Sequence, residues 1–222
     1  MTVERPTDLS QISRRALVGG AVAGGINMLA ENSVNAACLW TAKQAEGPFY
    51  PEEVSETDWD MTNVVGGTGR AFGEVIEVSG QVRDSRCHSA GGCTLEIWQA
   101  NARGRYAHLH DTGNSQPLDH NFQGYARIVA DGNGNYRFVT IVPGSYPANG
   151  DWIRPPHIHF KVKSEFSSLT TQMYFDGNEH NDQDYLLNGV ALEDRRALLV
   201  KFDQIHANGM RAGKFDLVLA DD

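Results

Sequence analysis

The sequence predicts an all-β protein, a β-sandwich with irregular loops and one short C-terminal helix. Three observations indicate this class: short runs in which apolar and polar residues alternate, turn residues between those runs, and little helical periodicity. The chain has 222 residues, of which 41% are hydrophobic, so it can bury a sizeable core. Residues 37–222 contain no repeat, low-complexity tract or linker, and we therefore expect one domain there.

The N-terminal segment, residues 1–36, resembles an export signal rather than part of the fold. Residues 13–18, Ser-Arg-Arg-Ala-Leu-Val, are similar to a twin-arginine motif, and a Gly/Ala-rich apolar stretch follows. This stretch is shorter than the ~20 apolar residues that a stable membrane span needs. Val34-Asn35-Ala36 is typical of a cleavage site. We expect an exported protein, periplasmic or extracellular, that begins at Ala37; a lipid anchor on Cys38 is a weaker alternative.

The body begins with an extended segment, residues 37–70, that contains Gly47-Pro48-Phe49-Tyr50-Pro51. Strands are then expected, in order, at residues 76–83, 94–99, 126–130, 136–142, 157–163, 170–175 and 215–220. Residues 131–135, Asp-Gly-Asn-Gly-Asn, predict a hairpin between two of these strands, because Gly and Asn accept positive φ. A helix is expected around residues 192–205, where leucine, phenylalanine and isoleucine recur at helical spacing.

Charge and cysteine content exclude two classes of function. The formal net charge of −9 argues against a nucleic-acid partner, since such proteins usually carry a basic patch. No CxxC motif is present, so a structural zinc site is not expected. Cys87 and Cys93 bracket a short loop that a disulfide could close in an exported protein, but Cys38 could compete for either partner.

Two histidines indicate a metal site. His157 and His159 lie in a predicted strand, where side chains at i and i+2 point to the same face and can reach one ion. The pair alone is about as consistent with two ordinary core or surface histidines. His108 and His110 have the same spacing, but they lie in a polar stretch typical of a loop, and we expect no metal role for them.

Two tyrosines favour a ferric ion over other metals at this site. Tyr106 and Tyr146 each follow a predicted strand closely, and either one alone is typical of a half-buried aromatic residue. A phenolate is a hard, anionic oxygen donor. Together with imidazole it suits a ferric ion better than zinc or copper(I).

At this point the sequence resembles a known family, the intradiol ring-cleavage dioxygenases, and within it the protocatechuate 3,4-dioxygenase type. The matching stretches occur in the family's order. They are Leu95-Glu96-Ile97-Trp98-Gln99-Ala100-Asn101-Ala102, Gly104-Arg105-Tyr106, Gly124-Tyr125-Ala126-Arg127, Thr140-Ile141-Val142-Pro143-Gly144-Ser145-Tyr146-Pro147, Arg154-Pro155-Pro156-His157-Ile158-His159-Phe160 and Leu169-Thr170-Thr171-Gln172-Met173-Tyr174-Phe175, with a weaker similarity at residues 47–51.

The resemblance implies an enzyme of aromatic-compound breakdown that cleaves a catechol-type ring with O2 to a cis,cis-muconate-type diacid. It also implies a non-haem Fe(III), whose ligands match four residues. These are Tyr106, Tyr146, His157 and His159. In the family, the tyrosine that matches Tyr146 leaves the iron when the catechol binds.

The same resemblance assigns further residues to the substrate pocket. Arg154 matches an arginine beside the substrate, where a fixed cation can stabilise carbanion character in the ring. A structural arginine paired with a nearby carboxylate is the alternative for Arg154. Gln172 matches a glutamine of the same pocket, and Trp98 and Tyr174 match residues expected to contact the substrate.

The sequence departs from the family pattern in three places. Ala148 stands where the protocatechuate type often has a tryptophan, and Cys87–Cys93 replaces a Pro-Val-Pro-Gly-like turn. The long N-terminal helical region through which catechol 1,2-dioxygenases dimerise is also missing. All four expected ligands are in one chain, so no second chain type is needed, and a homo-oligomer remains an option.

Two other functions compete with the dioxygenase hypothesis. One is an exported, non-catalytic β-sandwich that carries or binds a ligand and kept the fold. The other is a zinc hydrolase that adds a carboxylate such as Asp151 or Glu165 to the histidine pair. The sequence does not distinguish catechol, protocatechuate, hydroxyquinol and lignin-derived catechols as substrates.

Overall fold

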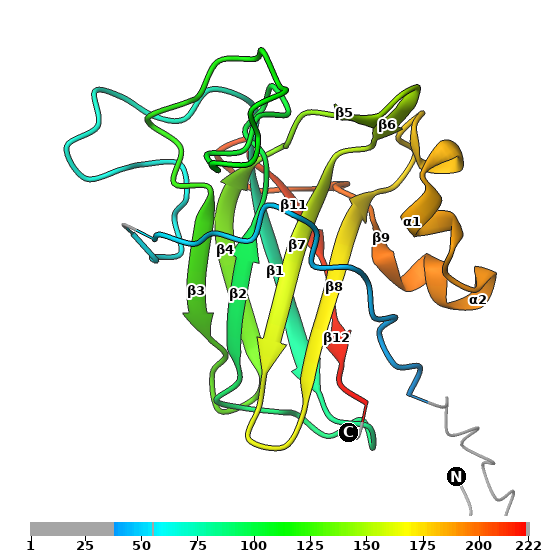
Figure 1. Ribbon diagram of the computed structural model, residues 1–222. Coiled ribbons are helices and arrows are strands. Elements are labelled where there is room, and N and C mark those ends of the chain that lie inside the picture. The colour runs from blue at the N-terminus through cyan, green and yellow to red at the C-terminus, as the bar shows by residue number, and fades with distance from the viewer. Residues whose placement is uncertain (1–37, 55, 221–222) are drawn as a thin grey trace, which may run out of the picture. The chain divides into compact units, whose positions relative to one another are not determined.

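A computed structural model describes residues 38–54 and 56–220, which form one compact unit. The predicted export signal, residues 1–36, lies outside the described residues. Most of the described chain that is regular is β-strand, as the sequence predicts, and the few helices are short (Figure 1).

Two five-stranded sheets make up the sandwich. The first contains β10 (Gln204–Ile205), β11 (Arg211–Lys214), β1 (Val75–Arg83) and β12 (Leu217–Val218) in this order, with β4 (Asn135–Ile141) also paired to β1. The second contains β3 (Tyr125–Val129), β2 (Thr94–Trp98), β7 (His157–Lys163), β8 (Ser168–Phe175) and β9 (Leu199–Val200). A small ribbon of β5 (Tyr146–Asn149) and β6 (Trp152–Arg154) lies outside both sheets.

Alternation along the strands builds the core between the sheets. Along β1 every second residue is buried, as the sequence pattern predicts. Apolar residues of β1 and β4 pack with those of β2, β7 and β8 in a single cluster. In Figure 1 the second sheet forms the front layer and β1 and β4 run behind it. The other face of the second sheet is therefore the outer face of the sandwich.

The predicted hairpin is wrong, although its turn is present. Asp131 Oδ1 accepts hydrogen bonds from the backbone N–H groups of Asn133 and Asn135, and Gly134 has a φ of 76°. The flanking strands β3 and β4 do not pair, however, because β3 pairs with β2 and β4 pairs with β1. Buried residues of the two strands, such as Ala126 and Phe138, instead meet across the core. The turn thus carries the chain from one sheet to the other.

The predicted helix is shorter than expected and gives way to a strand. Helix α1 (Tyr185–Asn188) precedes α2 (Leu192–Arg195), which continues as a 3-10 turn, η2 (Arg196–Leu198); another 3-10 turn, η1 (Asn181–Gln183), comes before α1. Leu199 then pairs with Tyr174 of β8. Pairing at this position covers part of the open edge of β8, which a further helical turn would leave unpaired, so tertiary structure overrides the helical spacing. Of the predicted strand at 215–220, only Leu217–Val218 is formed.

The segment of residues 41–51, which we call the strap, covers an edge and a face of the sandwich. Thr41 donates its backbone N–H to Val218 O of β12, and Gln44 donates its N–H to Thr170 O of β8. The strap therefore links the two sheets along the open edge of β8. It then crosses the outer face of the second sheet, where Figure 1 shows it in blue in front of β8 and β7.

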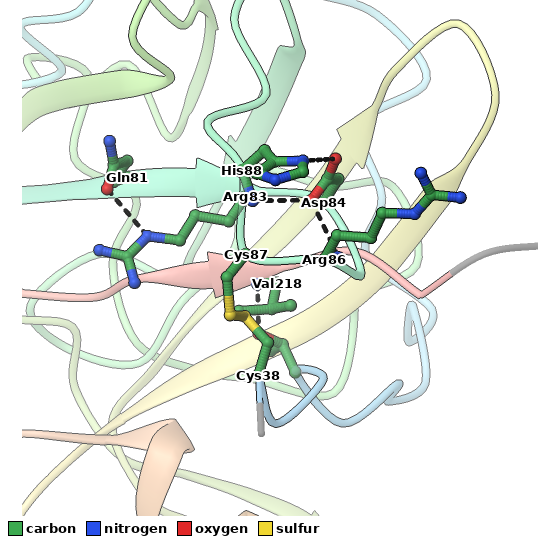
Figure 2. The surroundings of a disulfide bond; sticks show 9 residues. Cys38, Gln81, Arg83, Asp84, Arg86, Cys87, His88 and Val218 are labelled. Carbon is green, nitrogen blue, oxygen red and sulfur yellow. Dashed lines mark hydrogen bonds and ion pairs between the residues drawn. A yellow bond between two sulfur atoms is a disulfide. The ribbon is translucent and has the colours of Figure 1, made fainter. Parts of the chain in front are cut away.

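A disulfide fixes the beginning of the described chain. Cys38 is bonded to Cys87, with a Cα–Cα distance of 5.6 Å, whereas Cys93 is a free, buried thiol. Figure 2 shows the bond beside β12 and the turn at Asp84, whose carboxylate accepts the N–H of His88. Of the pairings that the sequence left open, the structure thus forms Cys38–Cys87. A Cys38 sulfur in a disulfide cannot also carry a lipid.

Candidate metal centre

The predicted histidine pair lies on the outer face of the second sheet. His157 and His159 project from β7 on the side opposite the apolar core residues Ile158 and Phe160. The strand register sets their neighbours: Trp98 and Gln172 flank His159, and Tyr174 lies beside His157. Five of the eight predicted site residues therefore gather on one patch of one sheet because of strand alternation alone.

Tyr106 comes to this patch from a loop, and Tyr146 comes from the first position of β5. The Tyr106 hydroxyl lies 3.4 Å from His157 Nε2, and the ring centroids of Tyr106 and Tyr146 are 5.6 Å apart. The Tyr146 ring lies 5.7 Å from that of His157, and the Nε2 atoms of His157 and His159 are 3.2 Å apart. None of the four side chains is more than 8% exposed. The structure thus brings the four predicted ligands together.

Two glycines bring the tyrosine loops into contact. Gly104 has a φ of 77°, and a Cβ there would lie 2.4 Å from Ser145 O. A Cβ at Gly144 would lie equally close, 2.4 Å, to Gly104 N. The Asn101 carbonyl ties the loops by accepting the N–H groups of both Gly104 and Gly144. Glycine is therefore needed on both sides of this junction, which positions Tyr106 and Tyr146 together.

The hydrogen bond between His157 and Pro155 O sets the tautomer of His157. His157 Nδ1 lies 2.7 Å from Pro155 O, which can only accept, so Nδ1 carries the proton and Nε2 presents its lone pair. His159 Nδ1 is buried without a hydrogen-bond partner among the described atoms. The Trp98 indole holds the His159 ring from one side, with centroids 4.7 Å apart and planes 10° from parallel.

These donors fit a metal ion. Two imidazole nitrogens bound to one ion, each about 2.1 Å from it, lie roughly 3 Å apart, as the two Nε2 atoms do. Burial, followed by the positive charge of Arg154, lowers the pKa of His159 to about 3. The same two causes lower the pKa of His157. Both imidazoles are therefore neutral near pH 7, which is the state that binds metals.

The tyrosines point to a strongly charged ion. Burial raises the pKa of the Tyr106 phenol, and the neighbouring Tyr146 raises it further. Burial also raises the pKa of Tyr146. Both phenols therefore keep their protons in the absence of a metal ion. A cation of high charge favours phenolate and can replace these protons.

The zinc-hydrolase hypothesis finds no support in the described part of the chain. Within it, no group of three His, Cys, Asp or Glu side chains could hold a metal ion. Asp151 and Glu165, the carboxylates considered from the sequence, are both exposed. His108 and His110 lie outside the ligand cluster: His108 Nε2 bonds Tyr50 O at 3.0 Å and its Nδ1 accepts the His110 N–H.

Arg154 lies next to the ligands in a dense polar network. Its Nε donates to Asp184 Oδ2 at 2.7 Å, and Nη2 donates to Gln172 Oε1 at 2.6 Å and to the Tyr174 hydroxyl at 3.3 Å. The side chains of Arg154 and Asp184 are only 6% and 0% exposed. The carboxylate pairing considered for a structural arginine is therefore present. It also gives the guanidinium one orientation beside the site, which a catalytic arginine requires.

Three of the predicted pocket residues are fully buried. Gln172 donates its amide to Ala45 O of the strap, and the Tyr174 hydroxyl donates to Gln44 Oε1. Trp98 contacts His159, as described above. These contacts support the ligands and Arg154, while direct substrate contact by Trp98, Gln172 and Tyr174 stays a prediction.

The strap also contributes to the cluster, although the sequence did not reveal this. Phe49 stacks on Tyr106 with centroids 4.6 Å apart, and Tyr50 meets Trp98 edge-on at 5.1 Å. Gly47 has a φ of 76°, and a Cβ there would lie 3.5 Å from His159 Cε1. The Gly-Pro-Phe-Tyr-Pro run was the available signal. A cavity of about 240 Å³ borders this region and is lined in part by Phe49, Trp98 and Tyr106.

Asp111 and Asp184 were missed as well. Asp111 Oδ2 accepts the backbone N–H of Tyr106 at 2.8 Å and so fixes the start of that ligand loop. Asp184 lies 30 residues beyond the arginine it pairs with, outside any motif that marks it. Neither carboxylate belongs to a local pattern that sequence inspection could detect.

Comparison with known proteins finds dioxygenases. A family model described as "Dioxygenase" matches residues 45–221. The chain is 38% identical to the protocatechuate 3,4-dioxygenase beta chain of Burkholderia cepacia, over 78% of this chain and 76% of that one. It is 34% identical to a chlorocatechol 1,2-dioxygenase of Pseudomonas putida, over 48% of this chain and 44% of that one, and so spans less than half of that relative.

Solved structures share the fold. The dioxygenase domain of a dioxygenase and carbohydrate-binding protein fusion from Streptomyces sp. SirexAA-E is 28% identical, with a TM-score of 0.63; the match covers 83% of this chain and all of that domain, 100%. A 3-chlorocatechol 1,2-dioxygenase from Rhodococcus opacus 1CP is 25% identical, with a TM-score of 0.65, and the match covers 85% and 77% of the two chains.

Proposed function

This chain belongs to the intradiol ring-cleavage dioxygenases, of the protocatechuate 3,4-dioxygenase type, and on that basis we propose that it holds one non-haem Fe(III). The enzymes of this family cleave catechol-type rings. The proposed ligands are Tyr106, Tyr146, His157 and His159. One observation carries the proposal: two neutral imidazoles and two phenols converge in a buried cluster, and this donor set suits a ferric ion.

When bound, the ferric ion supplies Lewis acidity that makes a catechol hydroxyl more acidic and prepares the ring to react with O2. The protein contributes a proton acceptor, Tyr146 Oη. Burial raises the pKa of this phenol, so a Tyr146 phenolate released from a bound ion would take up a substrate proton and hold it.

Tyr146 rather than Tyr106 fits the role of the ligand that leaves. Tyr106 is anchored through its N–H to Asp111 and is stacked against Phe49. Tyr146 begins the small β5–β6 ribbon, which lies outside the two main sheets. Tyr146, whose strand belongs to neither main sheet, is therefore the ligand proposed to leave.

Arg154 supplies a fixed positive charge beside the reacting ring. Asp184 and Gln172 already bind Nε and Nη2. Such a preoriented cation stabilises negative charge that develops on the ring in the transition state without reorganising at that moment. The strap residue Phe49 and the buried Trp98 add apolar cover that keeps water from the cluster.

We further propose that the protein is exported and that one chain type suffices. The twin-arginine-like run and the cleavage-site pattern support export, and the Cys38–Cys87 disulfide is typical of oxidising compartments. No helix among the described residues is long and apolar enough to cross a membrane. All four ligand side chains come from one chain, in a monomer or a homo-oligomer. Sequencing the N-terminus of protein from outside the cytoplasm tests export: a start near Ala37 supports it, and an intact Met1 contradicts cleavage.

Oxygen uptake across a panel of catechols tests the proposed activity. Catechol, protocatechuate, hydroxyquinol and chlorinated catechols should be compared, and the product should be a muconate-type diacid that retains both oxygen atoms of O2. Uptake with none of these substrates by the iron-loaded protein would contradict the proposal. A non-catalytic carrier is not favoured, because all four predicted ligands are present and the relatives are enzymes.

A further inference from the structure

Asp184 is the most buried carboxylate next to the proposed metal centre, and its own contribution to the reaction can be separated from that of Arg154. Its side chain is 0% exposed, and it lies just before α1, outside both main sheets. A buried carboxylate needs strong partners, because an unpaired charge in the interior is costly. Both oxygens of Asp184 have such partners.

The two oxygens of Asp184 serve different elements. Oδ1 accepts the N–H of Leu187 at 2.7 Å and caps α1, whereas Oδ2 accepts Arg154 Nε, also at 2.7 Å. The first bond fixes the carboxylate to its own helix. The second fixes the arginine to that carboxylate, so the position of α1 determines the position of the guanidinium.

The rest of the network completes the restraint on Arg154. Nη2 donates to Gln172 and Tyr174 of β8, while Nε donates to Asp184 from the opposite element. The described residues offer no hydrogen-bond partner to Nη1. The guanidinium is thus held on two sides, and Nη1 alone remains to donate to another molecule.

We propose that Asp184 is a positioning residue, which holds Arg154 in the orientation that stabilises the transition state. The proposal rests on the proposed function of Arg154 in ring cleavage. It separates two roles of Asp184, the helix cap and the ion pair, and assigns the catalytic effect to the ion pair. Gln172 alone cannot replace it, because Gln172 binds only Nη2.

The primary variant is Asp184→Asn, with Asp184→Ser as the second. Asn and Ser both cap helices well, so Leu187 N–H keeps an acceptor in either variant. In Asp184→Asn the amide NH2 group faces the donor Arg154 Nε, and in Asp184→Ser the side chain is too short to reach it. Each variant therefore releases Arg154 while it keeps the helix.

Asp216→Asn is a matched control. Asp216 also accepts one backbone N–H, from Gln81 at 2.9 Å, and one cation, Lys214 at 2.7 Å, but it lies between β11 and β12 of the first sheet. The ion pair of Asp216 and Lys214 is remote from the metal centre, so its loss should not affect the reaction. Asp216→Asn should therefore keep the wild-type kcat.

For both Asp184 variants we expect kcat to fall at least about ten-fold, with KM within about two-fold, because the interaction is made in the transition state. The iron content and the visible absorption should stay at wild-type values, because no ligand has changed. In an Arg154→Gln background, Asp184→Asn should lower kcat no further, since it acts only through Arg154.

Three results would overturn the proposal: a kcat for Asp184→Asn within two-fold of wild type, a second full loss in the Arg154→Gln background, or loss of iron from both Asp184 variants. The last result would make Asp184 a structural part of the metal centre. Failure of the wild-type, iron-loaded enzyme to consume O2 is a separate outcome, which contradicts the proposed function itself.

Discussion

Three of the four proposed ligands are supported by neighbouring residues outside the cluster. Pro155 O holds His157 Nδ1, Trp98 stacks on His159, and Asp111 anchors the backbone of Tyr106. Such supports fix ring orientation before the ion arrives and strengthen its binding. At the scale of single residues, the site is therefore organised by its neighbours as much as by its ligands.

Removing one imidazole should abolish iron binding. His159→Ala deletes a neutral donor from the cluster, and we expect the iron content per chain, measured by elemental analysis, to fall to a small fraction of wild type. His108→Ala is the control, because His108 bonds Tyr50 O outside the cluster, and it should keep full iron content. Full iron in His159→Ala would remove His159 from the ligand set.

Tyr146→Phe should separate binding of iron from turnover. Tyr146 is the ligand proposed to leave when substrate binds, so the other three must hold the iron without it, and the variant should retain iron although it loses one phenolate and the proton acceptor. We expect a changed visible spectrum and a kcat lower by about 100-fold, a typical loss for a general base. Stopped-flow mixing with catechol measures both, and an unchanged spectrum with wild-type kcat would show that Tyr146 is not a ligand.

The elements differ in how well the sequence predicted them. Strands β1, β2, β3, β4, β7 and β8 were expected to within two residues, because period-two alternation is local to each strand. The 131–135 hairpin was wrong and the 192–205 helix ends earlier than predicted, because both depend on which edge the chain meets later. The strap and the loop junction at Gly104 and Gly144 carry the site, yet their backbone conformations were not predictable from local pattern.

The need for glycine at the junction between the tyrosine loops can be tested by adding one methyl group, in Gly104→Ala. In Gly104→Ala the new Cβ meets Ser145 O and the backbone keeps a positive φ, so we expect unfolding free energy to fall by about 1–3 kcal/mol. Gly113→Ala, in the same loop with nothing near its Cβ, is the matched control. Denaturant unfolding of the iron-free proteins gives both values, and equal stabilities would show that the loops do not need glycine here.

The thermal stability of the protein should depend on the Cys38–Cys87 disulfide. Cys38 and Cys87 are separated by 49 residues, and the chain-entropy model assigns such a loop about 4 kcal/mol. We expect reductant to lower the Tm of the wild-type protein but not that of a Cys38→Ser/Cys87→Ser variant.

Counting thiols provides a second check on the disulfide. Cys93 should resist alkylation in the folded protein, since it is buried and burial raises the pKa of its thiol. One thiol should react after unfolding without reductant, and three after unfolding with it. A count of three without reductant would contradict the Cys38–Cys87 bond.

At the scale of the whole molecule, the residues that stabilise the fold and the residues of the proposed site lie on opposite faces of the second sheet. Its core lies between the sheets, whereas the cluster lies on the outer face of the second sheet and is covered by the strap and loops. The fold class could be predicted from the sequence because alternation is local, and the matching motifs gave the four proposed ligands, which the structure brings together. Asp184 could not be predicted, because its ion pair with Arg154 of β6 forms only after the segment before α1 has folded against that strand.

The visible absorption spectrum of the iron-loaded protein tests the four-ligand ferric site most directly. Charge transfer from tyrosinate to Fe(III) predicts a red to burgundy colour in the wild-type protein, lost when the iron is removed and changed in Tyr146→Phe. A colourless protein that binds zinc stoichiometrically would contradict the assignment of Tyr106, Tyr146, His157 and His159 as the ligands of a ferric ion.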